Sequence, residues 1–316
     1  MMITLKEAAN KIKAANKILV TAHVQPDGDA VGSTLATVQI LHALGKTAQV
    51  YIDDSVRNNL HTLPHFEEIR RPAEGEKFDA DLLLILDTYL DRIGNVRKMT
   101  DAPILNIDHH VTNSGEGVDL YLEHEAAATC EIVFKLAREL NATITPDIAT
   151  CIYTGLATDT GFFQFSNTRA ETLATASELI KCGVSPNFIS EQLEKKSLRE
   201  VQGLRAALNS LKMFYDNKVA GMLIDYETAQ TFDSTEGFVD EIRVIDTVDV
   251  AFLIIEKERN SCRVRMRSKG VDVSKIAKSL GGGGHIRAAG CTLKTTLAEA
   301  EKILIEKLGK AMRNEE

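Results

Sequence analysis

Short apolar segments alternate with longer segments of helical character between residues 17 and 160, and this alternation limits the fold more than any other feature of the chain. The apolar segments have the length of buried strands and cover residues 18–22, 48–52, 81–86 and 103–107. Residues 31–44 carry apolar side chains at helical spacing, and residues 125–140 and 146–158 are predicted as further helices. Strands that alternate with helices in this way predict an α/β fold with a doubly wound, mostly parallel sheet.

A second pattern of strands follows a helical stretch. Residues 169–181 and 186–213 are predicted to be helical. After them come predicted strands at 219–224, 250–255 and 262–266, a glycine-rich loop at 281–284 and an amphipathic helix at 297–312. We therefore expect an N-terminal α/β domain over residues 1–185, a helical linker over 186–215 and a smaller α/β domain over 216–316.

The composition is that of a soluble globular protein, with 44% hydrophobic and 26% charged residues. The longest apolar stretches, such as residues 82–86, are far too short to span a bilayer. The first residues lack the charged segment, apolar core and small-residue cleavage site of a secretion signal. We expect a cytoplasmic protein that makes no membrane contact.

Cysteine usage and net charge exclude two further classes. The five cysteines are odd in number, widely spaced and without a Cys-x-x-Cys pair, so reduced and mostly buried thiols are expected rather than a disulfide framework or zinc ribbon. The formal net charge of −8 is poorly suited to non-specific binding of long nucleic acid, which requires many phosphates to be neutralised. Short nucleotides need only a local cationic pocket and stay open as ligands.

Ionisable side chains stand at the ends of several predicted elements. Asp108-His109-His110 follows the fourth strand, Asp87 follows the third, and His23-Val24-Gln25-Pro26-Asp27-Gly28-Asp29 follows the first, while Asp159 closes a later segment. In an open α/β sheet, ligands bind outside the carboxyl ends of the strands, so these side chains are expected to converge. Imidazoles and carboxylates without thiolates favour Mn²⁺, Mg²⁺, Zn²⁺ or Fe²⁺.

The number of carboxylates favours two ions. One partly buried crevice would hold the four negative charges of Asp27, Asp29, Asp87 and Asp159. Unpaired, these charges would be very costly, whereas two divalent cations would neutralise them. Two ions about 3.5–4 Å apart suit an in-line phosphoryl displacement. Taken singly, each residue has a structural alternative: Asp29 as a helix N-cap, Asp87 as a turn residue and Asp159 as a helix end.

The order of these motifs resembles that of the DHH phosphoesterase superfamily. The motifs are His23-x-x-x-Asp27-x-Asp29, Asp87-Thr88, Asp108-His109-His110 and Ala157-Thr158-Asp159-Thr160-Gly161. The resemblance implies that one ion is bound by His23 and Asp27, the other by Asp29, His109 and Asp159, and that Asp87 bridges them. It also implies catalytic roles for Asp108, which would orient His109, and for His110, which would face the substrate phosphate. The following loop keeps Asn113 but lacks the usual aromatic-Gly continuation.

Two features of the C-terminal part indicate anion binding. Arg263-Val264-Arg265-Met266-Arg267-Ser268 alternates in strand fashion, which places its arginines on one face. Gly281-Gly282-Gly283-Gly284-His285 cannot continue a helix, and the missing side chains let backbone N–H groups approach an anion. The structural alternatives are an exposed cationic edge and a helix end followed by a flexible loop.

Residues 265–268 and 281–290 resemble the DHH-associated C-terminal domain. The two domains together are similar to stand-alone enzymes that hydrolyse short oligoribonucleotides, linear or cyclic dinucleotides, or 3'-phosphoadenosine 5'-phosphate. This resemblance implies a hydrolase with two divalent ions, Mn²⁺ in the first place and Mg²⁺ or Fe²⁺ as alternatives. The residues implied in substrate binding are Arg265, Arg267, Ser268, Gly283, Gly284 and His285.

Two other functions stay open on the sequence. The superfamily also contains inorganic pyrophosphatases and polyphosphatases, although the glycine-rich loop and the arginine strand argue mildly for a nucleotide. A non-catalytic nucleotide-binding sensor could keep the same fold, but here every expected metal position is filled. The sequence does not decide the oligomeric state, and a homodimer is one alternative.

Overall fold

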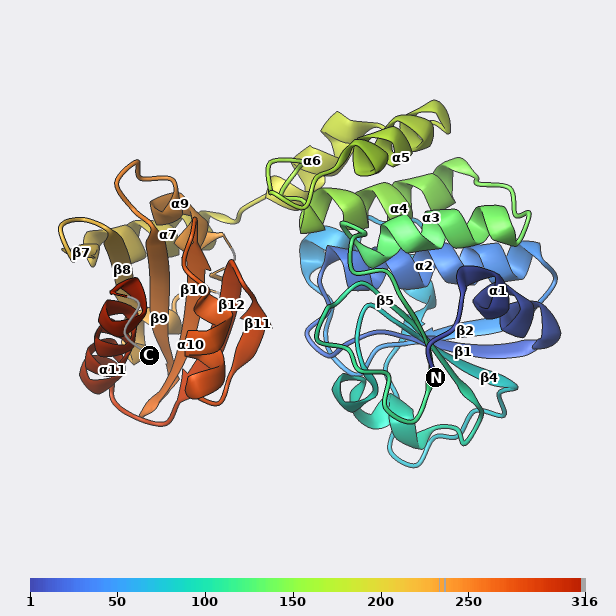
Figure 1. Cartoon of the computed structure of the whole chain (residues 1–316), viewed down its shortest axis with the longest axis horizontal. Coiled ribbons are helices and arrows are strands. Elements are labelled where there is room, and N and C mark those ends of the chain that lie inside the picture. Colours follow the sequence, from blue (N-terminus) through green and yellow to red (C-terminus); the bar gives the residue numbers. More distant parts are fainter. Residues whose placement is uncertain (233, 236, 314–316) are drawn as a thin grey trace. The chain divides into compact units, whose positions relative to one another are not determined.

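The computed structural model describes residues 1–232, 234–235 and 237–313, and the chain divides into two compact units, Met1–Lys195 and Lys196–Glu316 (Figure 1). The first unit contains a six-stranded sheet with the order β3-β2-β1-β4-β5-β6, in which all neighbouring strands are parallel. Its strands are β1 (Lys17–Thr21), β2 (Thr47–Tyr51), β3 (Ile69–Arg70), β4 (Leu82–Leu86), β5 (Ile104–Asp108) and β6 (Asp119–Leu122). The predicted α/β class with a mostly parallel sheet is confirmed.

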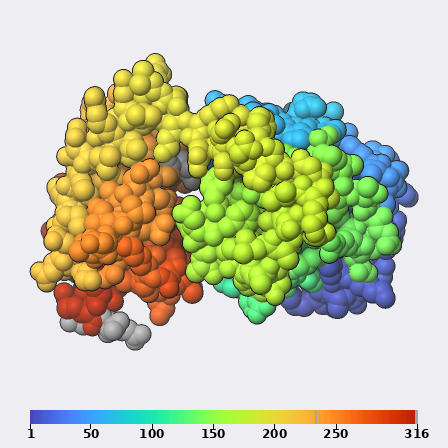
Figure 2. Space-filling view, turned by 90° about the horizontal axis from the view of Figure 1, so that it is seen from above, coloured from blue at the N-terminus to red at the C-terminus, as the bar shows by residue number. Residues whose placement is uncertain are grey.

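Helices cover one face of this sheet, and short 3-10 turns cover the other. On the first face lie α2 (Gly28–Ala43), α3 (Thr129–Glu139) and α4 (Pro146–Asp159) (Figure 1). Figure 2 shows α5 (Ala170–Lys181) and α6 (Pro186–Glu194), in yellow-green, on the outside of the unit. The remaining helices of the unit are α1 (Leu5–Ala14), η1 (Asn58–Leu60), η2 (Phe66–Glu68), η3 (Leu90–Arg92) and η4 (Gly94–Lys98). The opposite face of the sheet packs on side chains of the η3 and η4 region, namely Ile93, Val96 and Met99.

The four predicted strands of the first unit agree with β1, β2, β4 and β5, but β3 and β6 were not predicted. All five residues of β4 are buried because both faces of the sheet are covered, which explains its continuous apolar run. Strand β6 is an edge strand in which only Leu120 is fully buried, and β3 has two residues. Neither gives the apolar run or alternation by which strands are found in a sequence.

Helix α2 is buried from Gly28 to Leu41 because it lies between the sheet and α4. A Cβ atom on Gly32 would lie 2.4 Å from the carbonyl oxygen of Cys151, and one on Gly155 would lie 2.6 Å from Asp29 Oδ1. These two glycines let α2 and α4 approach at the level of the backbone. The approach brings Asp29, in the first turn of α2, close to the end of α4, where Asp159 stands.

The second unit contains a mixed sheet with the order β11-β12-β10-β9-β8-β7, in which only β8 and β9 are parallel. Its strands are β7 (Lys212–Phe214), β8 (Val219–Ile224), β9 (Val250–Glu258), β10 (Ser261–Ser268), β11 (Gly283–His285) and β12 (Ala288–Leu293). One face packs on α10 (Val273–Ser279) and α11 (Leu297–Met312). The other face packs on α7 (Leu198–Asn209) and α9 (Phe238–Arg243), with the short α8 (Tyr226–Ala229) beside β9.

Two segments differ from the pattern expected from the sequence. Residues 186–215, expected as a helical linker, contain α6 of the first unit and α7 and β7 of the second. The prediction of a loop over 281–284 is wrong at Gly283 and Gly284, because both belong to β11 and pair with β12. Glycine runs give no apolar periodicity, so sequence patterns miss such a strand.

Two further findings concern membrane-spanning helices and thiols. No helix in the described part of the chain is long and apolar enough to cross a membrane. All five cysteines are free, and four of them are buried.

Candidate metal centre and phosphate-binding face

Asp27 both caps a helix and faces an imidazole. Its Oδ1 accepts hydrogen bonds from the backbone N–H groups of Asp29 and Ala30, each at 3.1 Å, and so caps α2. Its Oδ2 lies 3.8 Å from Nε2 of His23. The His23 ring is oriented by a 2.8 Å hydrogen bond between Nδ1 and the Val24 carbonyl oxygen, which turns Nε2 toward the carboxylates. The N-cap of α2 is therefore Asp27 and not Asp29.

Asp87 lies between two imidazoles. One of its oxygens is 3.5 Å from His23 Nε2, and the other is 3.5 Å from His109 Nε2. The hydroxyl of Thr129 also donates to Asp87 at 3.1 Å. Asp87 has a φ of 60°, a left-handed conformation that is uncommon outside glycine and typical of functional sites. The backbone turns sharply at the end of β4 and brings this carboxylate to the centre of the cluster.

His109 joins Asp87 to the end of α4. Its Nε2 lies 3.5 Å from Oδ2 of Asp159, while its Nδ1 is hydrogen-bonded to the carbonyl oxygen of Ala126 at 3.2 Å. A ring that donates from Nδ1 presents Nε2 to a metal. The ligand atoms of Asp29, His109 and Asp159 lie within 4.8 Å of one another, and those of His23, Asp27 and Asp87 form a second such group.

Asp29 is fully buried and accepts two backbone hydrogen bonds from another helix. Its Oδ2 takes the N–H of Thr129 at 2.6 Å, and its Oδ1 takes that of Cys130 at 2.8 Å. Both donors belong to the first turn of α3, whose N-cap residue Ala128 offers no side chain for capping. Asp29 thus caps α3 from α2 and is fixed in place by it.

The pKa values show that the cluster carries more carboxylate than the histidines balance. Burial and the negative charge of Asp87 raise the pKa of Asp29 to about 7, and burial with Asp29 and Asp27 raises that of Asp159 well above its usual value. Burial lowers the pKa of His23, but Asp27 and Asp87 outweigh this and raise it to about 11. Protons on carboxylates and imidazoles are what divalent cations would replace.

The donor set fits divalent ions of the hard and intermediate class. Both groups consist of carboxylates and imidazoles, a donor set that favours Mn²⁺, Mg²⁺, Zn²⁺ or Fe²⁺. The Cys130 thiol lies close by, but burial and the charge of Asp29 raise its pKa well above the usual value. Its Sγ donates to the carbonyl oxygens of Asp29 and Cys151 at 3.8 and 3.9 Å, and among the described residues it belongs to neither group of ligand atoms. His23, Asp27, Asp29, Asp87, His109 and Asp159 are thus brought together, as the sequence led us to expect.

Asp108 holds the ring of His110. Its Oδ1 accepts a 2.7 Å hydrogen bond from His110 Nδ1 and further bonds from the backbone N–H groups of His109 and His110. Its Oδ2 accepts from the Asn113 amide at 2.6 Å. The sequence led us to expect that Asp108 orients His109, but the ring it binds is that of His110, and the His109 ring is oriented by Ala126.

Several supporting residues were missed by sequence reasoning. Ala126 and Thr129 contact ligands through a carbonyl and a hydroxyl, and Asn167 donates from its amide to the backbone oxygen of Asp159 at 3.0 Å. Ordinary residues of this kind give no signal in a sequence. Asn113, three residues after His110, is the exception, since it was already singled out from the sequence.

The arginines of β10 lie on one face of the second sheet. Cys262, Val264 and Met266 are buried in the core against α10 and α11, so Arg263, Arg265 and Arg267 face the other way. Arg267 Nε lies 3.4 Å from Asp240 Oδ1, and Arg265 donates to the Thr235 carbonyl at 3.2 Å. Ser268 is buried, and its hydroxyl donates to the Val271 carbonyl, which leaves it poorly placed for a ligand.

Strand β11 lies in register with these arginines. Gly290 of β12 pairs with both Arg265 and Gly283, and Ala288 pairs with both Arg267 and His285. Two strand spacings, roughly 10 Å, therefore separate the arginines from the exposed strand β11, with only small residues between them. Gly283 and His285 thus lie on the same face of the sheet as the row of arginines, across a floor of small residues, whereas Gly284 pairs with Ala289, which is buried in the core on the opposite face.

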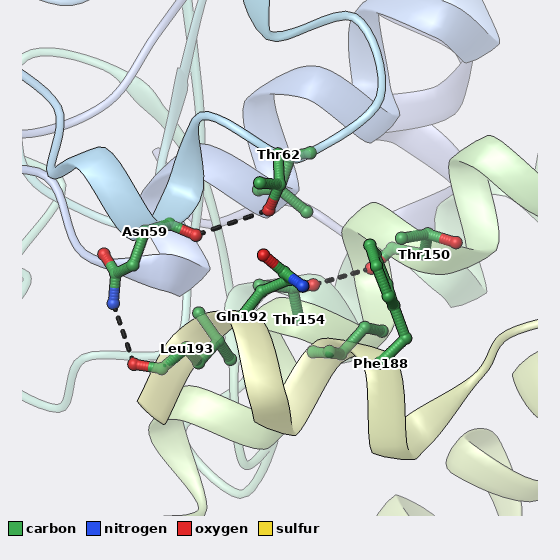
Figure 3. Close-up of a pocket in the computed structure, with 9 residues that line it drawn as sticks. Asn59, Thr62, Thr150, Thr154, Phe188, Gln192 and Leu193 are labelled. Atoms are coloured by element: carbon green, nitrogen blue, oxygen red, sulfur yellow. Dashed lines mark hydrogen bonds between the residues drawn. The ribbon is translucent and has the colours of Figure 1, made fainter. Parts of the chain in front are cut away.

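A small pocket elsewhere in the first unit carries no comparable chemistry. It lies where α6 packs on η1 and α4, and Asn59 there donates to the Leu193 carbonyl at 3.0 Å (Figure 3). Its lining consists of threonines, amides and apolar side chains without an ionisable group. We regard it as a packing gap between helices.

Comparison with known proteins agrees with this geometry. Residues 17–156 match the DHH family, N-terminal domain, and residues 217–314 match the DHHA1 domain. A protein of Thermus thermophilus, named bifunctional oligoribonuclease and PAP phosphatase NrnA, is 34% identical over 92% of this chain and 88% of its own length. The chain belongs to the DHH family.

Other DHH relatives resemble the chain more distantly. The cyclic-di-AMP phosphodiesterase PdeA of Listeria monocytogenes is 26% identical over 93% of this chain, which corresponds to 47% of that protein. The crystal structure of an exopolyphosphatase-related protein from Bacteroides fragilis superimposes with a TM-score of 0.89 at 26% identity. This match covers 97% of this chain and 95% of the other, so the DHH fold is retained throughout.

Proposed function

We propose that this chain is a two-metal phosphoesterase that hydrolyses short nucleotides: short oligoribonucleotides, linear or cyclic dinucleotides, or 3'-phosphoadenosine 5'-phosphate. The observation that carries the proposal is Asp87, which lies 3.5 Å from an imidazole on either side and so joins two groups of metal-ligand side chains. The names of the relatives from Thermus thermophilus and Listeria monocytogenes support the substrate class.

The residues divide into two ligand sets around Asp87. His23 and Asp27 would hold one ion and Asp29, His109 and Asp159 the other, with Asp87 shared between them. When bound, two divalent ions supply an acidified water and neutralise charge on the phosphoryl oxygens. We expect Mn²⁺, with Mg²⁺ or Fe²⁺ as alternatives.

His110 is assigned to the substrate phosphate. Its ring is fixed by the 2.7 Å hydrogen bond to Asp108, and Asp108 is fixed in turn by the Asn113 amide. A ring held in one orientation can donate a hydrogen bond to a phosphoryl oxygen without further ordering cost. We assign catalysis to the first unit, and to the second the binding of phosphate or base by Arg265, Arg267, Gly283, Gly284 and His285.

The main test is a substrate panel. Protein loaded with Mn²⁺ is incubated with RNAs of two to seven nucleotides, cyclic dinucleotides, 3'-phosphoadenosine 5'-phosphate, pyrophosphate and polyphosphate, and kcat/KM is ranked. We expect turnover of at least one nucleotide and its loss in Asp87→Ala. Mn²⁺-dependent turnover retained in Asp87→Ala would exclude the assigned centre.

The panel also separates the two other functions. Phosphate release from pyrophosphate or polyphosphate alone would identify a pyrophosphatase or polyphosphatase, a class that the description of the Bacteroides fragilis protein makes relevant. Tight binding of a dinucleotide without turnover would identify a sensor.

We further propose that the protein acts in the cytoplasm and on short rather than long nucleic acid. The net charge of −8 disfavours long nucleic acid, because phosphate neutralisation provides most of the affinity in such complexes. Light scattering in solution tests whether the chain is a homodimer.

A further inference from the structure

The backbone of residues 126–130 supports one ligand group of the metal centre. The carbonyl oxygen of Ala126 accepts from the His109 ring at 3.2 Å. The N–H groups of Thr129 and Cys130 donate to the two oxygens of Asp29 at 2.6 and 2.8 Å. This segment, which we call the support segment, is almost fully buried.

The support segment is also linked to Asp159. The Asn167 amide donates to the Ala127 carbonyl at 3.1 Å and to the Asp159 carbonyl at 3.0 Å. All three residues of the group Asp29, His109 and Asp159 are therefore held, directly or through one amide, by the same five residues. Thr129 also donates to Asp87, which belongs to the group of His23 and Asp27 and lies 3.5 Å from His109 Nε2.

The other ligand group is supported differently. The ring of His23 is oriented by the Val24 carbonyl, and Asp27 is held by N–H groups of its own helix. These contacts are local in sequence, and the support segment reaches this group through the hydrogen bond from the Thr129 hydroxyl to Asp87. A change in that segment should therefore affect one ion site more than the other.

Glu131 is hydrogen-bonded to the support segment at Ala127. Its side chain is fully buried, and Oε2 accepts hydrogen bonds from the Ala127 N–H at 3.1 Å and from the Thr172 hydroxyl at 2.9 Å. Its Oε1 lies 3.1 Å from Lys135 Nζ and 3.5 Å from an Arg169 guanidinium nitrogen. Both carboxylate oxygens of Glu131 are thus used. Removing this buried charge alone would be strongly destabilising, because its cationic partners would be left unpaired.

We propose that Glu131 is a positioning residue: it holds the support segment in place and so preforms the ion site of Asp29, His109 and Asp159. The inference rests on the proposed two-ion function. Replacing Glu131 with glutamine keeps the side-chain volume but replaces one acceptor oxygen by an NH2 group, which is a donor. In one orientation this NH2 group faces the Ala127 N–H and the Thr172 hydroxyl, and in the other it faces the cations of Lys135 and Arg169. The support segment loses its anchor at Ala127, and the ligands that it holds become less ordered.

The experiment measures Mn²⁺ binding rather than activity. Calorimetric titration and electron paramagnetic resonance follow ion number, affinity and the coupling between two ions in wild type, Glu131→Gln and Glu123→Gln. Glu123 also pairs with Lys135 but makes no side-chain contact to Ala127 among the described hydrogen bonds, so it serves as the matched control. In Glu131→Gln we expect one ion bound as in wild type, the other weakened about 10–100-fold, and the two-ion signal lost at stoichiometric Mn²⁺.

A second variant tests the proposal if Glu131→Gln does not fold. Thr172→Val removes one hydrogen bond to Glu131 with little change of shape, and it should weaken the same ion to a smaller extent. A His23→Gln background leaves the ion at Asp29, His109 and Asp159 as the main one to be observed and so assigns the weakened site.

The outcomes are distinguishable. Two ions bound with wild-type affinity by folded Glu131→Gln or by Thr172→Val, or equal weakening of both ions, would overturn the positioning role while the proposed function stands. Wild-type protein that binds fewer than two Mn²⁺ ions would instead overturn the proposed function.

Discussion

Replacing Gly32 with alanine tests whether the close packing of α2 and α4 sets the geometry of the metal centre. The added Cβ would lie 2.4 Å from the backbone oxygen of Cys151 and 3.2 Å from Cys130 Sγ. Real Cβ atoms essentially never lie closer than 3.0 Å to another heavy atom, and a backbone oxygen inside a helix cannot turn away. The two helices must therefore separate by at least about 0.6 Å, which is the difference between the 3.0 Å limit and the 2.4 Å contact with the Cys151 oxygen.

The expected loss of stability is modest. Overpacking of this kind costs about 1–3 kcal/mol, and the higher helix propensity of alanine returns about 1 kcal/mol. For a domain of this size, 1 kcal/mol corresponds to roughly 2–4 °C in Tm, so the ion-free protein should melt up to about 8 °C lower.

We expect the effect on metal affinity to be larger than the effect on stability. Metal–ligand distances tolerate only about 0.2 Å, and Asp29 and Asp159 stand on the two helices that separate. We expect Mn²⁺ binding at this ligand group to weaken about 10–100-fold.

Melting followed by circular dichroism in chelator and calorimetric titration with Mn²⁺ check both effects. Gly270→Ala is the control, because nothing lies within 4 Å of its added methyl group. Wild-type affinity in Gly32→Ala, whether or not Tm falls, would refute the link between helix packing and the ligand geometry.

Three further predictions concern the metal centre, the hydrogen bond that holds Asp108, and the arginines of β10. Mn²⁺ at about 100-fold over its Kd should stabilise the protein by about 2.7 kcal/mol per occupied site, and equal Tm values in Mn²⁺ and in chelator would contradict the metal assignment. Asn113→Ala removes the amide that donates to Asp108 at 2.6 Å, so kcat should fall about tenfold with Mn²⁺ affinity nearly unchanged; parallel losses in both would instead indicate a disturbed metal centre. Arg267→Gln should raise KM for a dinucleotide about tenfold or more and leave KM for a generic phosphodiester nearly unchanged, and equal changes for both substrates would argue against a role of Arg267 in nucleotide recognition.

The sequence was most informative where structure is local or strongly patterned. Strands β1 and β4 are buried on both faces, and their apolar runs end directly before the polar residues of the site. His23, Asp27 and Asp29 lie in one loop and helix turn, so their proximity follows from their spacing. Edge strands such as β6 and glycine strands such as β11 lack both signals and were missed.

The roles of neighbouring residues were harder to predict. Asp108 is adjacent to His109 in sequence, yet its Oδ1 binds the ring of His110, because the chain turns away from β5 after Asp108 and both following N–H groups fold back onto the same oxygen. Adjacency alone could not decide which ring would be reached.

The two ligand groups differ in the same respect, and this has a consequence for assembly of the centre. His23 and Asp27 are oriented by residues within three positions of themselves, so their geometry is encoded locally. Asp29, His109 and Asp159 come from three separate elements and are held together by backbone groups of the support segment, 100 residues beyond Asp29. Backbone amides and carbonyls are present in every residue, so no side-chain pattern reveals which of them are used. Sequence reasoning could therefore identify Asp29, His109 and Asp159 but not the contacts that orient them. The geometry of this ligand group depends on the whole domain being folded.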